Sequence, residues 1–278
     1  MKPFVRQALK VPLLLGGALA QADASRCIHL IYHSVSDRLK LELDLTYEIF
    51  QRQLVYLTRI GQIVSYDQAL AALQTHQPFA RPTFVLTFDD GYRDFYTHVY
   101  PLLQRFNAPA TLFVTTGFVE EQIPYPIQGR RAGEIQAVNW MMLGEMAASG
   151  LVTLGAHTHT HPILDAISHD QVEEELAKPL DFFQRELQMT PIHFAYPKAI
   201  WHPAVEAIVA RYYQSAAVGG VAPSGENGVF HPYRIPRLPI RRSDEWFFFR
   251  AKVHGWLANE EAAYECLHRW ATQNLCSE

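Results

Sequence analysis

Short apolar runs alternate along the chain with longer segments in which apolar residues recur at helical spacing. The runs typical of strands occupy residues 27–32, 63–65, 83–88, 110–115, 151–156, 192–196 and 214–218. The segments typical of helices occupy residues 47–60, 66–73, 95–106, 139–149, 168–188 and 204–212. About seven strand–helix units of this kind predict an α/β fold of parallel strands, either a β/α barrel or an open sheet.

Local signals set several of these boundaries. Thr46 is a predicted N-cap and Gly61 a C-terminal stop for the first helix, and Ser168 with Gln171 forms a capping-box pattern. Residues 118–138 show no clear period and are predicted to form a long functional loop. The proline-rich residues 232–239 carry no predicted element, and a helical tail is expected from about residue 243.

Composition limits the class of protein and of partner. The 278 residues are 49% hydrophobic, which suffices for a substantial core, and a formal net charge of −4 gives no basic field for nucleic acid. Three cysteines cannot all pair within the chain and lack zinc-knuckle spacing. We therefore expect a globular protein with no nucleic-acid partner.

The first 24 residues resemble a secretory signal. Lys2, Arg6 and Lys10 precede an apolar run over residues 11–20, which small residues follow. The run is too short for a stable membrane span, and a membrane-associated amphipathic helix is the alternative. Residues 1–24 thus predict export to the periplasm or cell envelope, with a cytoplasmic or membrane-associated protein as the alternative, and residues 25–278 are expected to form one domain.

An acidic pair ends the central apolar run. Asp89 and Asp90 follow the run over residues 83–88 and precede Gly91, which permits a tight turn. In α/β folds, ligands collect where parallel strands end. A helix N-cap followed by a turn would explain the same pattern without any chemistry.

Three alternating histidines follow another apolar run. His157 and His161 meet on one side whether this segment is extended or helical, whereas His159 joins them only in an extended chain. Two histidines and one carboxylate leave coordination positions open on a zinc-like ion, as a catalytic site requires. The cluster and the acidic pair together predict a metal site, and a hydrogen-bonded surface turn is the alternative.

Three motifs in this order resemble the NodB-type polysaccharide deacetylases, which form carbohydrate esterase family four. They are TFDDG at residues 87–91, HTHTHP at 157–162 and FAYP at 194–197, and the similarity extends from about residue 28 to about residue 240. The resemblance implies a distorted β/α barrel of about seven parallel strands. It also implies a hydrolase that uses one divalent ion, Zn²⁺ or alternatively Co²⁺ or Ni²⁺, to remove N-acetyl groups from amino sugars.

The resemblance assigns roles to individual residues. Asp89 would be the general base, and Asp90, His157 and His161 would hold the metal ion. Tyr196 and Pro197 would line the acetyl pocket. Lys198 and Ala199 replace the aromatic residue and glycine common in relatives, and the usual arginine motif is not recognisable, although Arg234 and Arg237 are candidates for a missing cation.

The general acid is assigned by analogy with one branch of the family. The Leu-x-His motif that supplies it in most members is absent after Tyr196. In the circularly permuted branch resembling poly-N-acetylglucosamine deacetylases, a Tyr-His motif on an early strand supplies it instead. Tyr32 and His33 match that motif, which predicts His33 as the acid, and a strand-end histidine that only hydrogen-bonds a nearby loop is the alternative.

The function expected is therefore deacetylation of an N-acetylglucosamine-containing polysaccharide. Two alternatives remain at this point. One is an amidohydrolase of small cyclic amides or ureides, whose site residues would look alike. The other is a glycan-binding protein that kept the fold without turnover.

Overall fold

The computed structural model describes residue 10, residues 26–121, residue 123, residues 135–220, residues 230–257, and residues 260 and 263. The predictions for residues 1–24 thus lie outside the described residues, apart from Lys10, and stay predictions. Lys10 is buried, and its ammonium lies 2.5 Å from the carboxylate of Asp244. Within the described part of the chain, no helix has the length and apolar character needed to cross a membrane.

Seven parallel strands close into a barrel, as the family resemblance implies. Around the barrel their order is β1, β10, β9, β8, β7, β6 and β5, and β5 pairs again with β1. These strands are β1 (Cys27–Tyr32), β5 (Thr83–Phe88), β6 (Ala110–Val114), β7 (Val152–Ala156), β8 (His193–Ala195), β9 (Ser215–Gly219) and β10 (Ile235–Pro239). Three shorter strands lie outside this ring: β2 (Ser34–Val35), β3 (Asp44–Leu45) and β4 (Gln62–Ile63), which pairs with β5.

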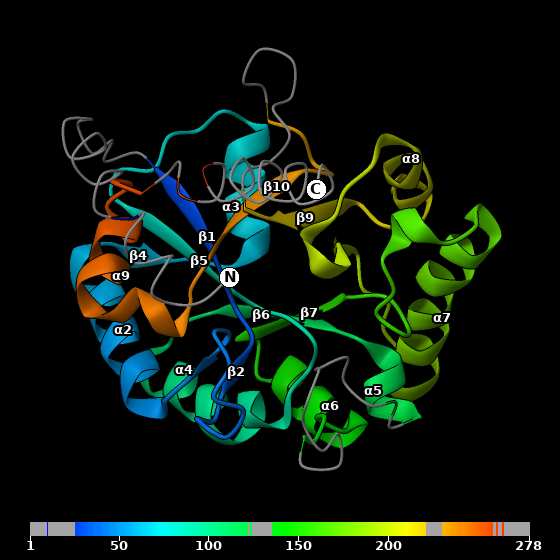
Figure 1. Ribbon diagram of the computed structural model, residues 1–278, viewed down its shortest axis with the longest axis horizontal. Helices are drawn as coiled ribbons and strands as arrows, with labels where there is room; N and C mark the ends of the chain where they lie inside the picture. The colour runs from blue at the N-terminus through cyan, green and yellow to red at the C-terminus, as the bar shows by residue number, and fades with distance from the viewer. Residues whose placement is uncertain are drawn as a thin grey trace, which may run out of the picture.

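Helices surround the barrel on most sides (Figure 1). They are α2 (Tyr47–Ile60), α3 (Tyr66–Gln74), α4 (Tyr100–Phe106), α5 (Thr116–Glu120), α6 (Trp140–Ala148), α7 (His169–Leu187), α8 (Pro203–Tyr212) and α9 (Glu245–Val253). The described residues also form short turns: the π-helical turn η1 (Phe95–Val99) and the 3₁₀ turns η3 (Leu164–Ala166), η4 (Pro197–Ala199) and η6 (Arg242–Asp244). The predicted caps at Thr46 and Ser168 are present, each accepting a backbone hydrogen bond through its side chain.

Alternation along the strands separates two layers of core. On β5, Phe84, Leu86 and Phe88 belong to the large cluster that packs under the helices. Val85 instead joins Phe113, Ala195, Ala217 and Ile235 in a cluster made by residues of five different strands. Because successive strand residues face opposite sides of the sheet, this second cluster lies inside the barrel. Helix α3 adds Tyr66, Ala69 and Leu70 to that cluster.

The barrel closes through a strand that the sequence pattern did not predict. Residues 232–239 read as a proline-rich segment because proline cannot donate to a strand ladder. In the structure, β10 pairs with both β1 and β9, and Arg237 lies opposite His29 on one side and Gly219 on the other. The run predicted at residues 63–65 contributes only the two-residue strand β4 outside the ring.

Candidate metal centre and active site

Strand β5 ends in two carboxylates with different partners. Asp89 still follows the strand, since its amide donates to the Tyr32 carbonyl oxygen at 3.1 Å. Asp90 and Gly91 then turn into the left-handed region, with φ of +75° and +81°. An aspartate at positive φ is uncommon, and such residues cluster at functional sites. The turn gives the two neighbouring side chains separate environments at the carboxyl end of β5.

The segment after β7 brings His157 and His161 together. The amide of His157 donates to the Val114 carbonyl oxygen at 2.9 Å, which continues the pairing with β6. Thr158 and His161 both have positive φ, and the amide of His161 donates to the Thr158 hydroxyl at 3.0 Å. The resulting tight loop leaves the two imidazole centroids 4.9 Å apart.

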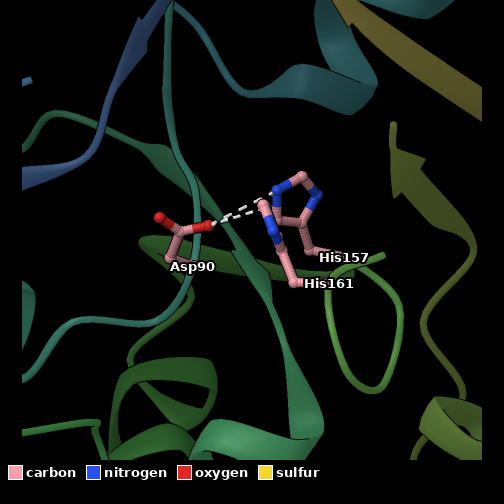
Figure 2. Close-up of side chains that lie close together, drawn as sticks. All are labelled: Asp90, His157 and His161. Atoms are coloured by element: carbon pink, nitrogen blue, oxygen red, sulfur yellow. Dashed lines mark ion pairs between the residues drawn. The ribbon is translucent and has the colours of Figure 1, made fainter. Parts of the chain in front are cut away.

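Both histidines face Asp90 (Figure 2). The Asp90 Oδ1 atom lies 3.3 Å from Nε2 of His161 and 3.5 Å from Nε2 of His157. One ligand atom from each of the three residues lies within 4.8 Å of the others. A tetrahedral ion with zinc-like bond lengths requires ligand atoms about 3.3 Å apart. The two measured separations agree with that spacing.

The hydrogen bonding of Asp90 and His157 leaves room for a cation between them. Nδ1 of His157 lies 2.7 Å from the Ala195 carbonyl oxygen, which can only accept, so Nδ1 carries the proton and Nε2 a lone pair. Asp90 Oδ1 is buried without a hydrogen-bond partner in the described structure. Two electron-rich atoms therefore face each other, an arrangement that a positive ion between them stabilises.

Burial keeps both imidazoles neutral at physiological pH. It lowers the pKa of His157 to about 4 and outweighs the opposing effect of Asp89 and Asp90. It also lowers the pKa of His161 to about 4, with a further contribution from the Lys198 ammonium. Neutral imidazole is the form that binds metal ions. The donor set of two histidines and one aspartate thus fits a divalent ion with open coordination positions.

Asp89 is held by a buried arginine. Arg237 Nη1 donates to Asp89 Oδ1 at 2.6 Å, and Nη2 donates to Oδ2 at 2.9 Å. Burial alone would raise the pKa of Asp89, but Arg237 and, to a lesser extent, His157 lower it to about 2. Asp89 Oδ2 lies 3.8 Å from Nε2 of His157. The carboxylate is therefore ionised and adjacent to the cluster of Asp90, His157 and His161.

A cavity of about 660 Å³ brings most of the candidate residues together. Its lining includes His33, Asp89, Asp90, His157, His161 and Tyr196. His33 lies close enough that its charge helps to lower the pKa values of Asp89 and His161. Pro197 is buried but does not line the cavity, whereas its neighbours Lys198 and Ala199 do.

His159 and Arg234 lie away from this chemistry. His159 hydrogen-bonds Thr116 at 3.0 Å and contacts Glu121 at 3.2 Å, and its ring stacks on Phe182. The segment is thus not extended, and only the outer two histidines meet. Arg234 pairs with Glu206. The sequence offered Arg234 and Arg237 as candidates for the missing cation. Arg237, which lies in strand β10, is the one that pairs with Asp89.

Comparison with known proteins identifies the family to which these features belong. A family model described as polysaccharide deacetylase matches residues 76–215. The poly-beta-1,6-N-acetyl-D-glucosamine N-deacetylase of Escherichia coli K12 is 31% identical over 138 residues, which cover 47% of this chain and 20% of that protein. The chain therefore spans only a small part of this curated relative.

Solved structures show the same fold. IcaB from Ammonifex degensii superposes with a TM-score of 0.67 at 22% identity, covering 86% of this chain and 98% of that one. The Streptococcus pyogenes deacetylase PplD, solved in complex with acetate, gives a TM-score of 0.62 at 25% identity, covering 77% of this chain and 93% of that one.

Proposed function

The chain belongs to the polysaccharide deacetylase family, and on that premise we propose that it hydrolyses the N-acetyl groups of a poly-N-acetylglucosamine chain to release acetate. The observation that carries the proposal is the cavity in which an arginine-held carboxylate, Asp89, adjoins the cluster of Asp90, His157 and His161. The Escherichia coli relative is named for deacetylation of such a β-1,6-linked polymer. Acetate, with which PplD was solved, is the expected product.

In this proposal, Asp90, His157 and His161 hold one divalent ion, with Zn²⁺ as the first candidate and Co²⁺ or Ni²⁺ as alternatives. When bound, the ion would polarise the acetamide carbonyl and acidify water. The Ala195 carbonyl fixes the tautomer of His157, so that its Nε2 atom offers a lone pair to the ion.

Asp89 accepts the proton of the attacking water, and Arg237 keeps its carboxylate ionised and in place. As the water oxygen bonds to the carbonyl carbon and the carbon–nitrogen bond breaks, His33 donates a proton to the leaving amine. Acetate and a free amino sugar result. Tyr196 forms part of the cavity wall and would lie against the acetyl group of the substrate. Pro197 directly follows Tyr196 and is buried outside the lining, so it has no direct contact with substrate in this proposal.

Acetate release from β-1,6-linked N-acetylglucosamine oligomers tests the proposal. We expect release that stops with a chelator, returns with added Zn²⁺, and falls by about 10²- to 10⁴-fold in Asp89→Asn and His33→Ala. Asp165→Asn, on an exposed side chain, is the matched control and should retain activity.

A wider panel separates the alternatives. Turnover of β-1,4-linked or peptidoglycan-derived sugars instead would change the polymer but keep the reaction. Turnover of small cyclic amides alone would favour the second enzyme class. Glycan binding with no acetate release from any metal-loaded sample would overturn the proposal in favour of a binding protein.

A further inference from the structure

A second cavity shares two wall residues with the cavity of about 660 Å³ that contains Asp90, His157 and His161, called the metal cavity below. It has a volume of about 300 Å³, and Leu39 and Tyr92 line both cavities. Both side chains are largely buried, at 8% and 6% exposure, so they form a partition between the two spaces. The residues that line only the second cavity have no part in the reaction proposed above. This second cavity therefore needs an explanation of its own.

An uncommon helical turn builds one wall of the second cavity. Residues Phe95–Val99 form the π-helical turn η1, in which the Tyr100 amide donates to the Phe95 carbonyl. The apolar ends of this turn, Phe95 and Val99, are fully buried in the core. The residues between and before them, Thr97, His98 and Asp94, line the cavity. Turns of this type are rare and frequently occur at functional sites.

The polar groups of the second cavity suit a hydroxyl-bearing ligand. Nδ1 of His98 donates to the Val35 carbonyl oxygen at 2.7 Å, and its Nε2 atom has no hydrogen-bond partner among the described residues. Arg93 is exposed and uses one of its guanidinium donors on the side chain of Gln136 at 2.8 Å. The exposed hydroxyl of Thr97 adds a group that can both donate and accept.

The same cavity also offers apolar surface. Leu39, Tyr92 and Ile135 line it beside the polar groups and belong to one hydrophobic cluster. A sugar ring presents hydroxyl groups around its rim and C–H groups on its faces. Pockets that combine apolar walls with a few placed donors and acceptors are typical of such ligands.

We propose that the second cavity is a subsite for another sugar of the same glycan chain, bound while the metal cavity holds the reacting N-acetyl group. The identity of the ligand rests on the proposed function. A polymer is long enough to place one sugar in each of two adjacent cavities, whereas a small amide can occupy only one. The subsite would therefore make longer chains better substrates.

Chain-length dependence of the kinetics tests this subsite. The specificity constant kcat/KM is measured for the disaccharide and the hexasaccharide of β-1,6-linked N-acetylglucosamine. In the wild type, we expect kcat/KM to be higher for the hexasaccharide than for the disaccharide. Arg93→Ala removes a hydrogen-bond donor and Thr97→Trp fills the cavity, so each should make this ratio about tenfold smaller. Arg59→Ala is the matched control, since Arg59 is an exposed arginine on α2 outside both cavities.

Binding of the hexasaccharide to metal-free protein separates this proposal from the proposed function. Weaker binding in Arg93→Ala than in wild type and Arg59→Ala would support the subsite even if no acetate is released. An equal gain with length in all variants, or equal binding by all of them, would overturn the subsite while leaving deacetylation intact. Melting temperatures confirm folding, and Arg93→Ala alone decides the outcome if Thr97→Trp does not fold.

Discussion

Asp89 and Asp90 are neighbours in sequence, yet their surroundings give them different chemistry. Arg237 occupies both oxygens of Asp89 with hydrogen bonds. Asp90 Oδ1 instead faces two imidazole nitrogens and has no hydrogen-bond donor among the described residues. The left-handed turn at Asp90 separates the two side chains. One carboxylate is thereby suited to accept a proton and the other to bind an ion.

Substitution of Arg237 by lysine should impair the reaction more than metal binding. Lysine keeps the positive charge but cannot form the paired hydrogen bonds that fix Asp89. We expect kcat/KM for acetate release to fall by about 10- to 100-fold, while Zn²⁺ affinity changes by less than about threefold. Steady-state kinetics and titration with a chromogenic chelator measure the two quantities.

Arg234→Lys is the control for this substitution. Arg234 holds Glu206 through two hydrogen bonds of similar length, 2.6 and 3.0 Å, outside the cavity lining. Its replacement should leave kcat/KM within about twofold of wild type. Equal losses in both variants would mean that Arg237 acts only through stability.

At this scale the sequence predicted residue types better than it predicted contacts. The acidic pair and the outer histidines could be selected because each follows directly on an apolar strand-like run. Ionisable side chains at such a position are not needed for a hydrophobic core. Arg237 could not be selected with the same certainty, because its partner is 148 positions away. Only the register of β10 against β1, with Arg237 opposite His29, brings it inside the barrel.

Among the elements, helix α7 holds the loop that carries the two histidines. The Glu175 carboxylate accepts from the amides of His159 and Thr160 at 2.9 and 2.8 Å, and from the Thr160 hydroxyl at 2.6 Å. Helix α5 adds a bond from the Gly117 amide to the His159 carbonyl oxygen at 2.8 Å. The loop between His157 and His161 is thus fixed from both helices.

Glu175→Ala should therefore weaken metal binding. Without these three hydrogen bonds the loop samples geometries in which His157 and His161 no longer share a ligand position. We expect Zn²⁺ affinity to fall by about 10- to 100-fold, as for other residues that orient metal ligands. Glu175→Gln keeps a hydrogen-bond acceptor, so its loss of Zn²⁺ affinity should be smaller. Competition with a chelator measures the affinity of each variant.

Glu174→Ala provides the comparison for Glu175. Glu174 is the preceding residue on α7, is 60% exposed and pairs only with Lys178 within the described structure. Its replacement should leave Zn²⁺ affinity unchanged, because an exposed ion pair contributes little. Wild-type affinity in Glu175→Ala would show that the loop keeps its shape without α7.

At the scale of the whole molecule, the closed barrel needs small residues beside large ones in its interior. A Cβ atom placed on Gly155 would lie 2.5 Å from the Phe113 ring, so this glycine leaves room for the aromatic side chain inside the barrel. Six of the seven ring strands followed from the apolar runs, whereas the run at residues 63–65 proved to lie outside the ring. The strand that closes the ring did not follow from them, because closure depends on pairing between the first strand and the last, and prolines obscured the last.

The barrel interior also contains a histidine that makes no hydrogen bond within the described structure. Both ring nitrogens of His29 are buried without a partner, and the ring packs edge-on against Tyr66. Burial, with a smaller effect from Arg237, lowers the pKa of His29 from 6.5 to about 3. Folding at acidic pH therefore has to keep this imidazole neutral.

His29 should make the free energy of unfolding depend on pH in a definable window. The pKa of His29 is lower in the folded state than in the unfolded state. The stability that depends on a neutral His29 is therefore fully present above pH 6.5 and is lost as pH falls toward 3. We expect wild type to lose up to about 1.4 kcal/mol per pH unit relative to His29→Leu within that window. Urea unfolding with a chelator present, at pH 7 and pH 5, measures the difference. His169 is exposed, so His169→Leu should show the same change in unfolding free energy between pH 7 and pH 5 as wild type. If His29→Leu also shows the wild-type change, His29 is protonated in the folded barrel and the prediction is wrong.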